Sequence, residues 1–222
     1  MSKPLAVLAD ANVLVKDVVS YVFFDLNKVG AVDLRWTPAI EVEYIKHRAR
    51  LRAQAQGRVS SLEDLLWAER RLIPIKTYLV PHHLPPGWDV HGHHLTELRR
   101  KAVFTTLLEL PDPDDAHVAL AAAGWAHASG HHVLLCTDNL KDLPAELLEP
   151  FGVTPLHPGD VLQLAYQVNP NRVAASLKKT AADFKNPAFS LMDMLASVRS
   201  LQQFDNSQLA DQLATRWGLM RR

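Results

Sequence analysis

The chain has 222 residues, of which 48% are hydrophobic, so it can bury the core of one domain of ordinary size together with an appendage. Lysine plus arginine and aspartate plus glutamate number 24 each. This balance excludes binding of nucleic acid through overall charge, and any such contact has to come from a local patch.

Nothing in the sequence predicts export or membrane insertion. The amino-terminal apolar run, Leu5 to Ala9, is short, and no segment approaches the roughly 20 apolar residues that span a bilayer. The single cysteine, Cys136, excludes an internal disulfide and lies in an apolar run, which favours a buried side chain over a reactive thiol. We therefore expect a cytoplasmic protein.

Two continuous apolar runs, residues 5–9 and 132–137, predict buried strands. Weaker strands are predicted at residues 34–36 and 152–154. Helical periodicity covers most of the remainder, at residues 13–28, 38–55, 60–72, 96–109 and 114–128. Apolar strands separated by helices predict an α/β fold with a central parallel sheet flanked by helices.

The pattern changes after residue 157, where four short helices follow without a strand signal. Ser190 and Asp193 form a capping-box pattern at the start of one of them. We therefore divide the chain into a sheet-containing domain, residues 1–157, and a helical carboxyl-terminal extension, residues 158–222.

Acidic residues lie where predicted elements reach one edge of the sheet. Asp10 follows the first strand and Thr137-Asp138-Asn139 follows the second, while Glu43 and Asp115 lie on or beside helices. Ligand sites of open parallel sheets lie beyond the carboxyl ends of the strands. Clustered carboxylates repel one another unless a cation neutralises them, and Mg²⁺ or Mn²⁺ favours such oxygen ligands. The pattern predicts a metal-dependent nuclease site.

Each position also has an ordinary structural explanation. Asp10 and the Asp112-Pro-Asp-Asp115 run are typical helix caps, and Thr137-Asp138-Asn139 is a common turn sequence. On its helix, Glu43 falls about 60° from the apolar stripe and Glu41 about 90° away on the other flank, so the geometry favours Glu43 only weakly. The ensemble of positions, rather than any one of them, indicates the site.

Four motifs in order resemble those of PIN-domain ribonucleases. They are Val7-Leu-Ala-Asp-Ala-Asn-Val-Leu14, Trp36-Thr-Pro-Ala-Ile-Glu-Val-Glu43, Leu110-Pro-Asp-Pro-Asp-Asp-Ala-His-Val118 and Thr137-Asp-Asn-Leu-Lys-Asp-Leu-Pro144. The chain is most similar to the VapC-like toxins of bacterial toxin–antitoxin pairs that carry a helical carboxyl-terminal extension. The resemblance implies a PIN-like fold, cleavage of RNA with Mg²⁺ or Mn²⁺, a cognate antitoxin and a homodimer.

The resemblance also implies roles for individual residues. Asp10, Glu43, Asp115 and Asp138 would be catalytic, and Asp10 and Asp115 would hold the metal. Many PIN domains have aspartate where this chain has Asn139, so Asp138, Asn139 and Asp142 remain alternatives for the fourth acidic position. Further contacts to substrate are expected from residues near the acids and on the following helix, namely Asn12, Thr137, Asn139, Lys46 and Arg48.

A basic segment and a histidine-rich loop each have more than one possible function. The segment from Tyr44 to Arg58 has five cations and no acid, which fits phosphate contact, a solvated face or a socket for an acidic partner such as an antitoxin. The cations are Lys46, Arg48, Arg50, Arg52 and Arg58. Five histidines between His82 and His94 suggest zinc, but their spacing fits no familiar structural zinc motif, and a loop over the site is an equal alternative.

Other functions fit less well. A phosphatase with an aspartyl nucleophile needs an acid where this chain has Asn12, and a receiver domain would lack the helical segment between residues 38 and 110. The main alternative to a nuclease is a non-catalytic PIN-like scaffold that binds RNA or protein.

Overall fold

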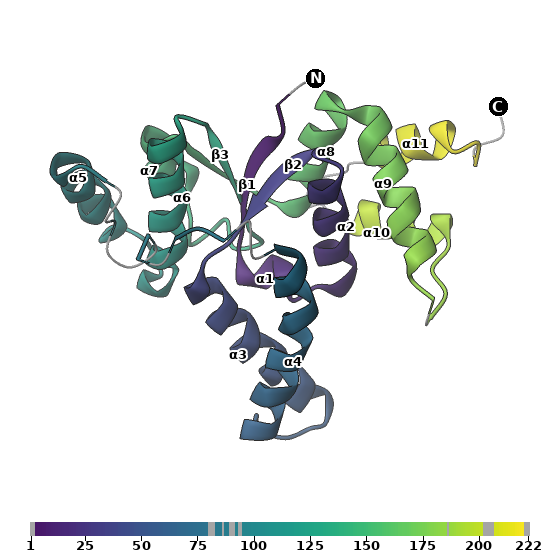
Figure 1. The fold of residues 1–222 in the computed structure, drawn as a ribbon, viewed down its shortest axis with the longest axis horizontal. Coiled ribbons are helices and arrows are strands. Elements are labelled where there is room, and N and C mark those ends of the chain that lie inside the picture. The colour runs from purple at the N-terminus through teal and green to yellow at the C-terminus, as the bar shows by residue number, and fades with distance from the viewer. Residues whose placement is uncertain are drawn as a thin grey trace.

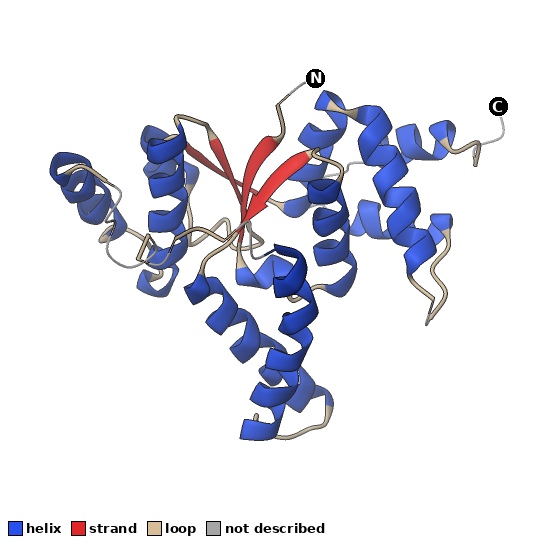
Figure 2. Cartoon of the chain, viewed as in Figure 1, coloured by secondary structure: helices blue, strands red, loops and turns tan. Residues whose placement is uncertain are grey.

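Four parallel strands form the centre of the described fold, in the order β2-β1-β3-β4 (Figure 2). They are β1 (Leu5–Ala9), β2 (Val32–Arg35), β3 (Val133–Cys136) and β4 (Val153–Leu156). The predicted α/β class with a parallel sheet is confirmed, and each predicted strand overlaps an observed one. The structure is a computed structural model that describes residues 3–79, 83–85, 87–88, 92, 95–185, 187–201 and 207–219.

The register of the central strands decides which residues meet at the carboxyl edge. In the ladder between β1 and β3, Ala9 lies opposite Cys136. The next residues continue this pairing, since the Asp10 amide donates to the Cys136 carbonyl at 3.0 Å. Asp10 and Thr137 therefore leave the sheet side by side, although a long stretch of chain separates them.

Helices cover both faces of the sheet (Figure 1). Helix α6 packs on β3 and β4 with α5 outside it, while α2 packs on β2 and α8 on β3 from the other side. The elements before the extension are α1 (Ala11–Leu14), α2 (Asp17–Lys28), α3 (Pro38–Ala55), α4 (Leu62–Leu79), α5 (Glu97–Leu107), the 3₁₀ turn η2 (Pro113–Asp115), α6 (Ala116–Ser129), α7 (Ala145–Leu148) and the 3₁₀ turn η3 (Glu149–Phe151).

The single helix predicted over residues 13–28 is wrong, because the chain forms α1 and α2 instead. Lys16 is extended at the junction. The break leaves the Val15 carbonyl available, and Arg48 of α3 donates a hydrogen bond to it. A contact from a distant helix thus stabilises a break that local periodicity does not predict.

Helices α3 and α4 form a hairpin that projects beyond the carboxyl edge of the sheet (Figure 1). Helix α3 begins where the Thr37 hydroxyl accepts from the Ile40 amide, and Pro38 occupies the first turn. The hairpin places the beginning of α3, with Glu43 in its second turn, beside the strand ends.

In the described part of the chain, four helices follow β4, as predicted: α8 (Pro158–Val168), α9 (Pro170–Asp183), α10 (Leu191–Ser200) and α11 (Ser207–Arg216). The capping box of Ser190 and Asp193 is confirmed. Helix α9 packs on α2, where the Thr180 hydroxyl donates to the buried Asp25 carboxylate at 2.7 Å. Apolar residues of all four helices belong to the same core as the sheet, so the boundary predicted after residue 157 does not separate two cores.

Within the described residues, no helix has both the length and the apolar character needed to cross a membrane.

Candidate metal centre

Asp10 is a buried carboxylate at the end of β1, with only 1% of its surface exposed. Although it occupies the cap position of α1, its side chain makes no capping hydrogen bond. Its Oδ2 instead accepts from Asn12 Nδ2 at 2.6 Å and from Thr137 Oγ1 at 2.7 Å. Burial raises the pKa of Asp10 to about 6 against the effect of the Thr137 hydrogen bond, and the charge of Glu43 raises it further.

Thr137 organises the turn after β3. Its fully buried hydroxyl donates to Asp10 and accepts from the Asn139 amide at 2.9 Å. Asn12 connects the same two loops, because its Oδ1 accepts from the Asp138 amide at 3.2 Å while its Nδ2 donates to Asp10. The predicted positions Asn12, Thr137 and Asn139 therefore orient the acids in this structure.

Asp115 is the second buried carboxylate and ends η2 just before α6. Asn139 Nδ2 donates to its Oδ2 at 2.7 Å. Burial raises the pKa of Asp115 to about 7, and the nearby charges of Asp10, Asp112, Glu43 and Asp142 add to that effect. A continuous hydrogen-bonded path runs from Asp10 through Thr137 and Asn139 to Asp115.

Glu43, and not Glu41, is the helix glutamate that faces these acids. The charge of Glu43 raises the pKa values of both Asp10 and Asp115, and its Oε2 lies 3.5 Å from His117 Nε2. Glu41 is buried elsewhere, with Oε1 3.2 Å from Trp36 Nε1 and 2.7 Å from His83 Nε2. The weak geometric preference for Glu43 thus agrees with the structure, although Glu41 is the more buried of the two.

His117 links Glu43 to the loop before α6. Its Nδ1 lies 2.8 Å from the Asp114 carbonyl, which can only accept, so Nδ1 carries a proton. Burial lowers the pKa of His117, but the hydrogen bonds to Glu43 and to the Asp114 carbonyl outweigh that effect, and the pKa is raised overall. The sequence motif contains this histidine, yet its spacing alone did not indicate the contact with Glu43.

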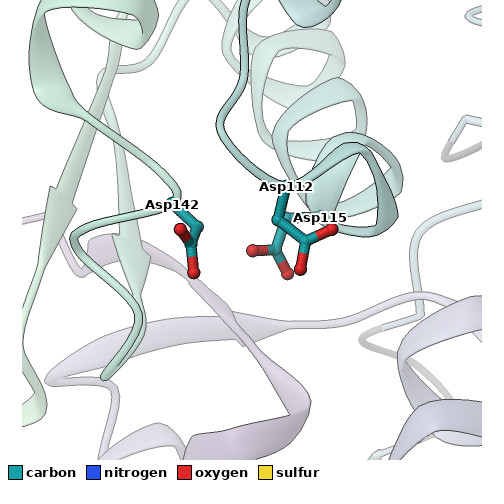
Figure 3. A group of neighbouring side chains, drawn as sticks. All are labelled: Asp112, Asp115 and Asp142. Atoms are coloured by element: carbon teal, nitrogen blue, oxygen red, sulfur yellow. The ribbon is translucent and has the colours of Figure 1, made fainter.

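Two further aspartates approach Asp115 (Figure 3). Asp112 comes from the same segment before α6, and Asp142 from the loop after β3. One oxygen from each of the three carboxylates lies within 4.8 Å of the others. Among the described residues, these three form the group of acidic, histidine or cysteine side chains that lie close enough together to hold one metal ion. The charges of Asp10 and Glu43 also act on Asp115 and raise its pKa.

Asp138 is not directed toward these acids. Its Oδ1 lies 2.8 Å from His157 Nε2 and its Oδ2 lies 2.5 Å from Lys16 Nζ. It is not among the main charges that shift the pKa of Asp10 or Asp115. Of the alternatives for the fourth position, the structure brings Asn139 and Asp142 to Asp115 and pairs Asp138 with Lys16 and His157.

The predicted basic surface of α3 is largely occupied by contacts within the protein. Arg48, predicted to contact substrate, bonds the Val15 carbonyl and pairs with Asp17 at 2.5 Å. Arg58 forms a two-pronged pair with Asp64, and Arg52 lies 3.5 Å from the same carboxylate. These hydrogen bonds from Arg58 hold the pKa of Asp64 well below its usual range.

Lys46, Arg50 and Arg58 are the exposed cations of this segment, and Arg58 is paired with Asp64. Arg48 and Arg52 also lie over the ring of Trp67, at 5.9 and 5.0 Å from its centroid. The helix therefore offers fewer cations for phosphate contact than the sequence suggests.

The histidine-rich loop is only partly described. His82, His91, His93 and His94 lie outside the described residues, so the zinc hypothesis stays untested. The His83 side chain pairs with Glu41, and the His83 backbone forms an isolated parallel β-bridge with Trp36, just after β2.

The donor set fits a hard divalent cation. The raised pKa values of the buried Asp10 and Asp115 indicate that the surrounding protein supplies too little positive charge to stabilise their ionised forms. The buried Oε2 of Glu43 lies 3.5 Å from His117 Nε2 and makes no closer hydrogen bond within the described structure. Carboxylate and amide oxygens are the ligands that Mg²⁺ and Mn²⁺ favour.

Comparison with protein-family models, with curated protein sequences and with solved structures found no match to this chain. The resemblance to PIN-domain ribonucleases therefore rests on the four sequence motifs, and the activity that it implies is a proposal.

Proposed function

We propose that the protein is a metal-dependent endoribonuclease that hydrolyses RNA phosphodiester bonds and acts as the toxin of a bacterial toxin–antitoxin pair. The observation that carries the enzymatic part is the hydrogen-bonded path from Asp10 through Thr137 and Asn139 to Asp115. This path holds two buried carboxylates with raised pKa values at the carboxyl edge of a parallel sheet, where ligand sites of open α/β sheets lie.

Asp10 and Asp115 are the residues that would hold Mg²⁺ or Mn²⁺. When bound, such an ion supplies positive charge for the phosphate and lowers the pKa of a bound water. Asn12 and Thr137 keep the Asp10 carboxylate in one orientation, and Asn139 does the same for Asp115. Glu43, paired with His117, adds a carboxylate that can accept a proton at the edge of the site.

The toxin assignment, the antitoxin and the homodimer follow from the sequence resemblance alone. For RNA, the exposed Lys46 and Arg50 on α3 support contact with substrate phosphates. Arg48 pairs with Asp17 and donates to the Val15 carbonyl, so its role is structural, between α3 and the break that separates α1 from α2.

One observation favours the alternative of a non-catalytic RNA-binding scaffold. The carboxylate of Asp138, one of the four expected catalytic acids, is paired with Lys16 and His157. Asp142 and Asp112 approach Asp115 and offer the further carboxylates that Asp138 does not bring to the site. For this reason the nuclease remains the preferred function.

The test is incubation of the purified protein with total bacterial RNA in Mg²⁺ or Mn²⁺, with EDTA as a control and mapping of the fragment ends. We expect discrete, metal-dependent fragments that Asp10→Ala abolishes. Glu146→Ala removes an exposed carboxylate from α7 and serves as the matched control that keeps activity. Intact RNA with every metal would refute the nuclease and favour the scaffold.

A further inference from the structure

A largely apolar pocket of about 440 Å³ lies between α5 and α6, outside the set of acids. Its deeper wall contains the buried Leu107 and Leu120, and its rim contains Phe104 and Leu108, which are 39% and 87% exposed. Ligand pockets of similar volume commonly take small molecules or parts of larger ones. An aromatic ring and a leucine that remain so exposed offer a ready contact surface for a flat apolar group.

The pocket adjoins the metal centre through two residues. His117 lines the pocket, and its Nε2 lies 3.5 Å from Oε2 of Glu43. Asp114 also lines the pocket and directly precedes Asp115 in the chain. A ligand that fills the pocket therefore lies next to any group bound at Asp115.

We propose that this pocket binds one unpaired nucleobase of the RNA substrate, beside the phosphodiester to be cleaved. This inference rests on the proposed ribonuclease function. A nucleobase is flat and can stack on Phe104 while its edges contact Leu107 and Leu120. The exposed Asp114 carboxylate is an acceptor at the rim, suited to an exocyclic amino group or a ring N–H.

Continuity with the acids favours a nucleobase over an apolar segment of a partner protein. A nucleotide carries a flat base and a phosphate on one short unit, and here an apolar pocket adjoins a candidate site for a phosphate-binding cation through Asp114 and His117. A protein segment in the pocket would leave that juxtaposition unexplained.

The matched pair of variants is Leu108→Ala and Leu98→Ala. Both leucines are more than 80% exposed and lie at opposite ends of the α5 segment, but only Leu108 lines the pocket. Both substitutions should leave the fold intact, because neither side chain is part of the core. Phe104→Ala and Phe104→Trp complete the set, since tryptophan keeps a stacking surface.

The probe is a short single-stranded RNA of mixed sequence that contains 2-aminopurine, bound to the Asp10→Asn variant so that it is not cut. We expect quenching of 2-aminopurine on binding, and a Kd that Phe104→Ala weakens roughly 5- to 150-fold, the range of a lost base stack. Leu108→Ala should weaken binding in the same direction, Phe104→Trp should restore it, and Leu98→Ala should leave it unchanged.

Cleavage assays of the same variants with Asp10 retained separate the two proposals. If RNA is cut, and neither the pocket variants nor an abasic nucleotide placed near the cleavage position changes KM, the nucleobase pocket is overturned and the nuclease stands. If quenching depends on Phe104 but no RNA is cut, the pocket stands as an RNA contact and the nuclease fails. Normal RNA binding by Phe104→Ala, combined with loss of a protein partner, would assign the pocket to that partner instead.

Discussion

The hydroxyl of Thr137 donates a hydrogen bond of 2.7 Å to Oδ2 of Asp10, a residue 127 positions earlier in the chain. The parallel register of β1 and β3 brings the two together, because Ala9 lies opposite Cys136 and the next residue of each strand leaves the sheet at the same edge. The same hydroxyl accepts from the Asn139 amide, so one buried atom ties the first acid to the turn that orients the second.

Replacing Thr137 by valine should therefore weaken both the fold and the site. Valine keeps the shape but leaves the Asp10 carboxylate with one donor fewer, since only the donor from Asn12 stays, and it removes the acceptor of the Asn139 backbone N–H. We expect a loss of about 1–3 kcal/mol in the free energy of unfolding, measured by urea denaturation, and reduced RNA cleavage. Thr137→Ser, which keeps the hydroxyl, is the control. Equal stability of the valine and serine variants would show that these hydrogen bonds contribute little.

Asp10→Asn should separate stability from activity. The pKa of Asp10 is raised to about 6, so its ionised form destabilises the folded state at pH 8 when no metal is bound. The amide removes that charge and can still accept from Thr137, so the variant in EDTA should be more stable by up to about 3 kcal/mol. RNA cleavage should be lost. A less stable variant in EDTA would contradict the electrostatic account.

Stability without metal should fall as the pH rises. The pKa values of Asp10 and Asp115 are raised to about 6 and about 7, above the unfolded-state value near 4. Between about pH 4 and pH 7 the folded protein holds more protons than the unfolded chain, so the free energy of unfolding decreases with pH across that window. Calorimetry in EDTA should show a steeper fall in Tm for the native protein than for a variant carrying asparagine at both positions.

Metal should reverse this dependence. Binding of Mn²⁺ requires both carboxylates ionised, so Mn²⁺ should raise Tm more at pH 8 than at pH 5 and should release protons. Titration calorimetry in buffers of different ionisation enthalpy measures that release. Identical Mn²⁺ stabilisation at both pH values would argue against Asp10 and Asp115 as ligands.

Asn139→Asp should tighten metal binding while it destabilises the metal-free protein. The side-chain amide of Asn139 donates to the Asp115 carboxylate at 2.7 Å. A carboxylate in place of this amide would repel Asp115 until a cation neutralises the pair. We expect a lower Tm in EDTA at pH 8 and about tenfold tighter Mn²⁺ binding by calorimetry. Asn139→Ala, which removes the hydrogen bond without adding charge, should show no gain in affinity.

Asp142 and Asp138 should differ in their effects on metal dependence. Asp142 lies in the group with Asp112 and Asp115, whereas Asp138 pairs with Lys16 and His157. Asp142→Asn should raise the Mn²⁺ concentration for half-maximal cleavage about tenfold. Asp138→Asn should leave it nearly unchanged and cost about 1 kcal/mol of stability. The reverse order would make Asp138 the fourth metal carboxylate.

Much of the site could be anticipated because it depends on strand ends. The apolar runs at residues 5–9 and 132–137 predict buried parallel strands, and the observed strands end beside Asp10 and Thr137. The approach of Asp115 follows from the resemblance of its motif rather than from periodicity. Local patterns also correctly predict the capping box of Ser190 and Asp193, since its two hydrogen bonds lie within a few residues.

What escaped prediction depends on partners from distant segments. The pairing of Asp138 with Lys16 and His157 requires the ends of three elements to meet. The sequence predicts that Arg48 contacts RNA. In the structure α3 packs against the break between α1 and α2, where Arg48 binds the Val15 carbonyl and Asp17.

The sequence by itself determined most of the elements, the parallel class of the sheet and the edge to which Asp10 and the Thr137 turn come, because local hydrophobic patterning and backbone chemistry control those properties. Only the tertiary structure decided the direction of Asp138, the choice of Glu43 over Glu41 and the packing of the last four helices on the shared core. These outcomes depend on which charges, donors and apolar surfaces meet in space, and a carboxylate turns toward its nearest cation or donor wherever in the chain that partner lies.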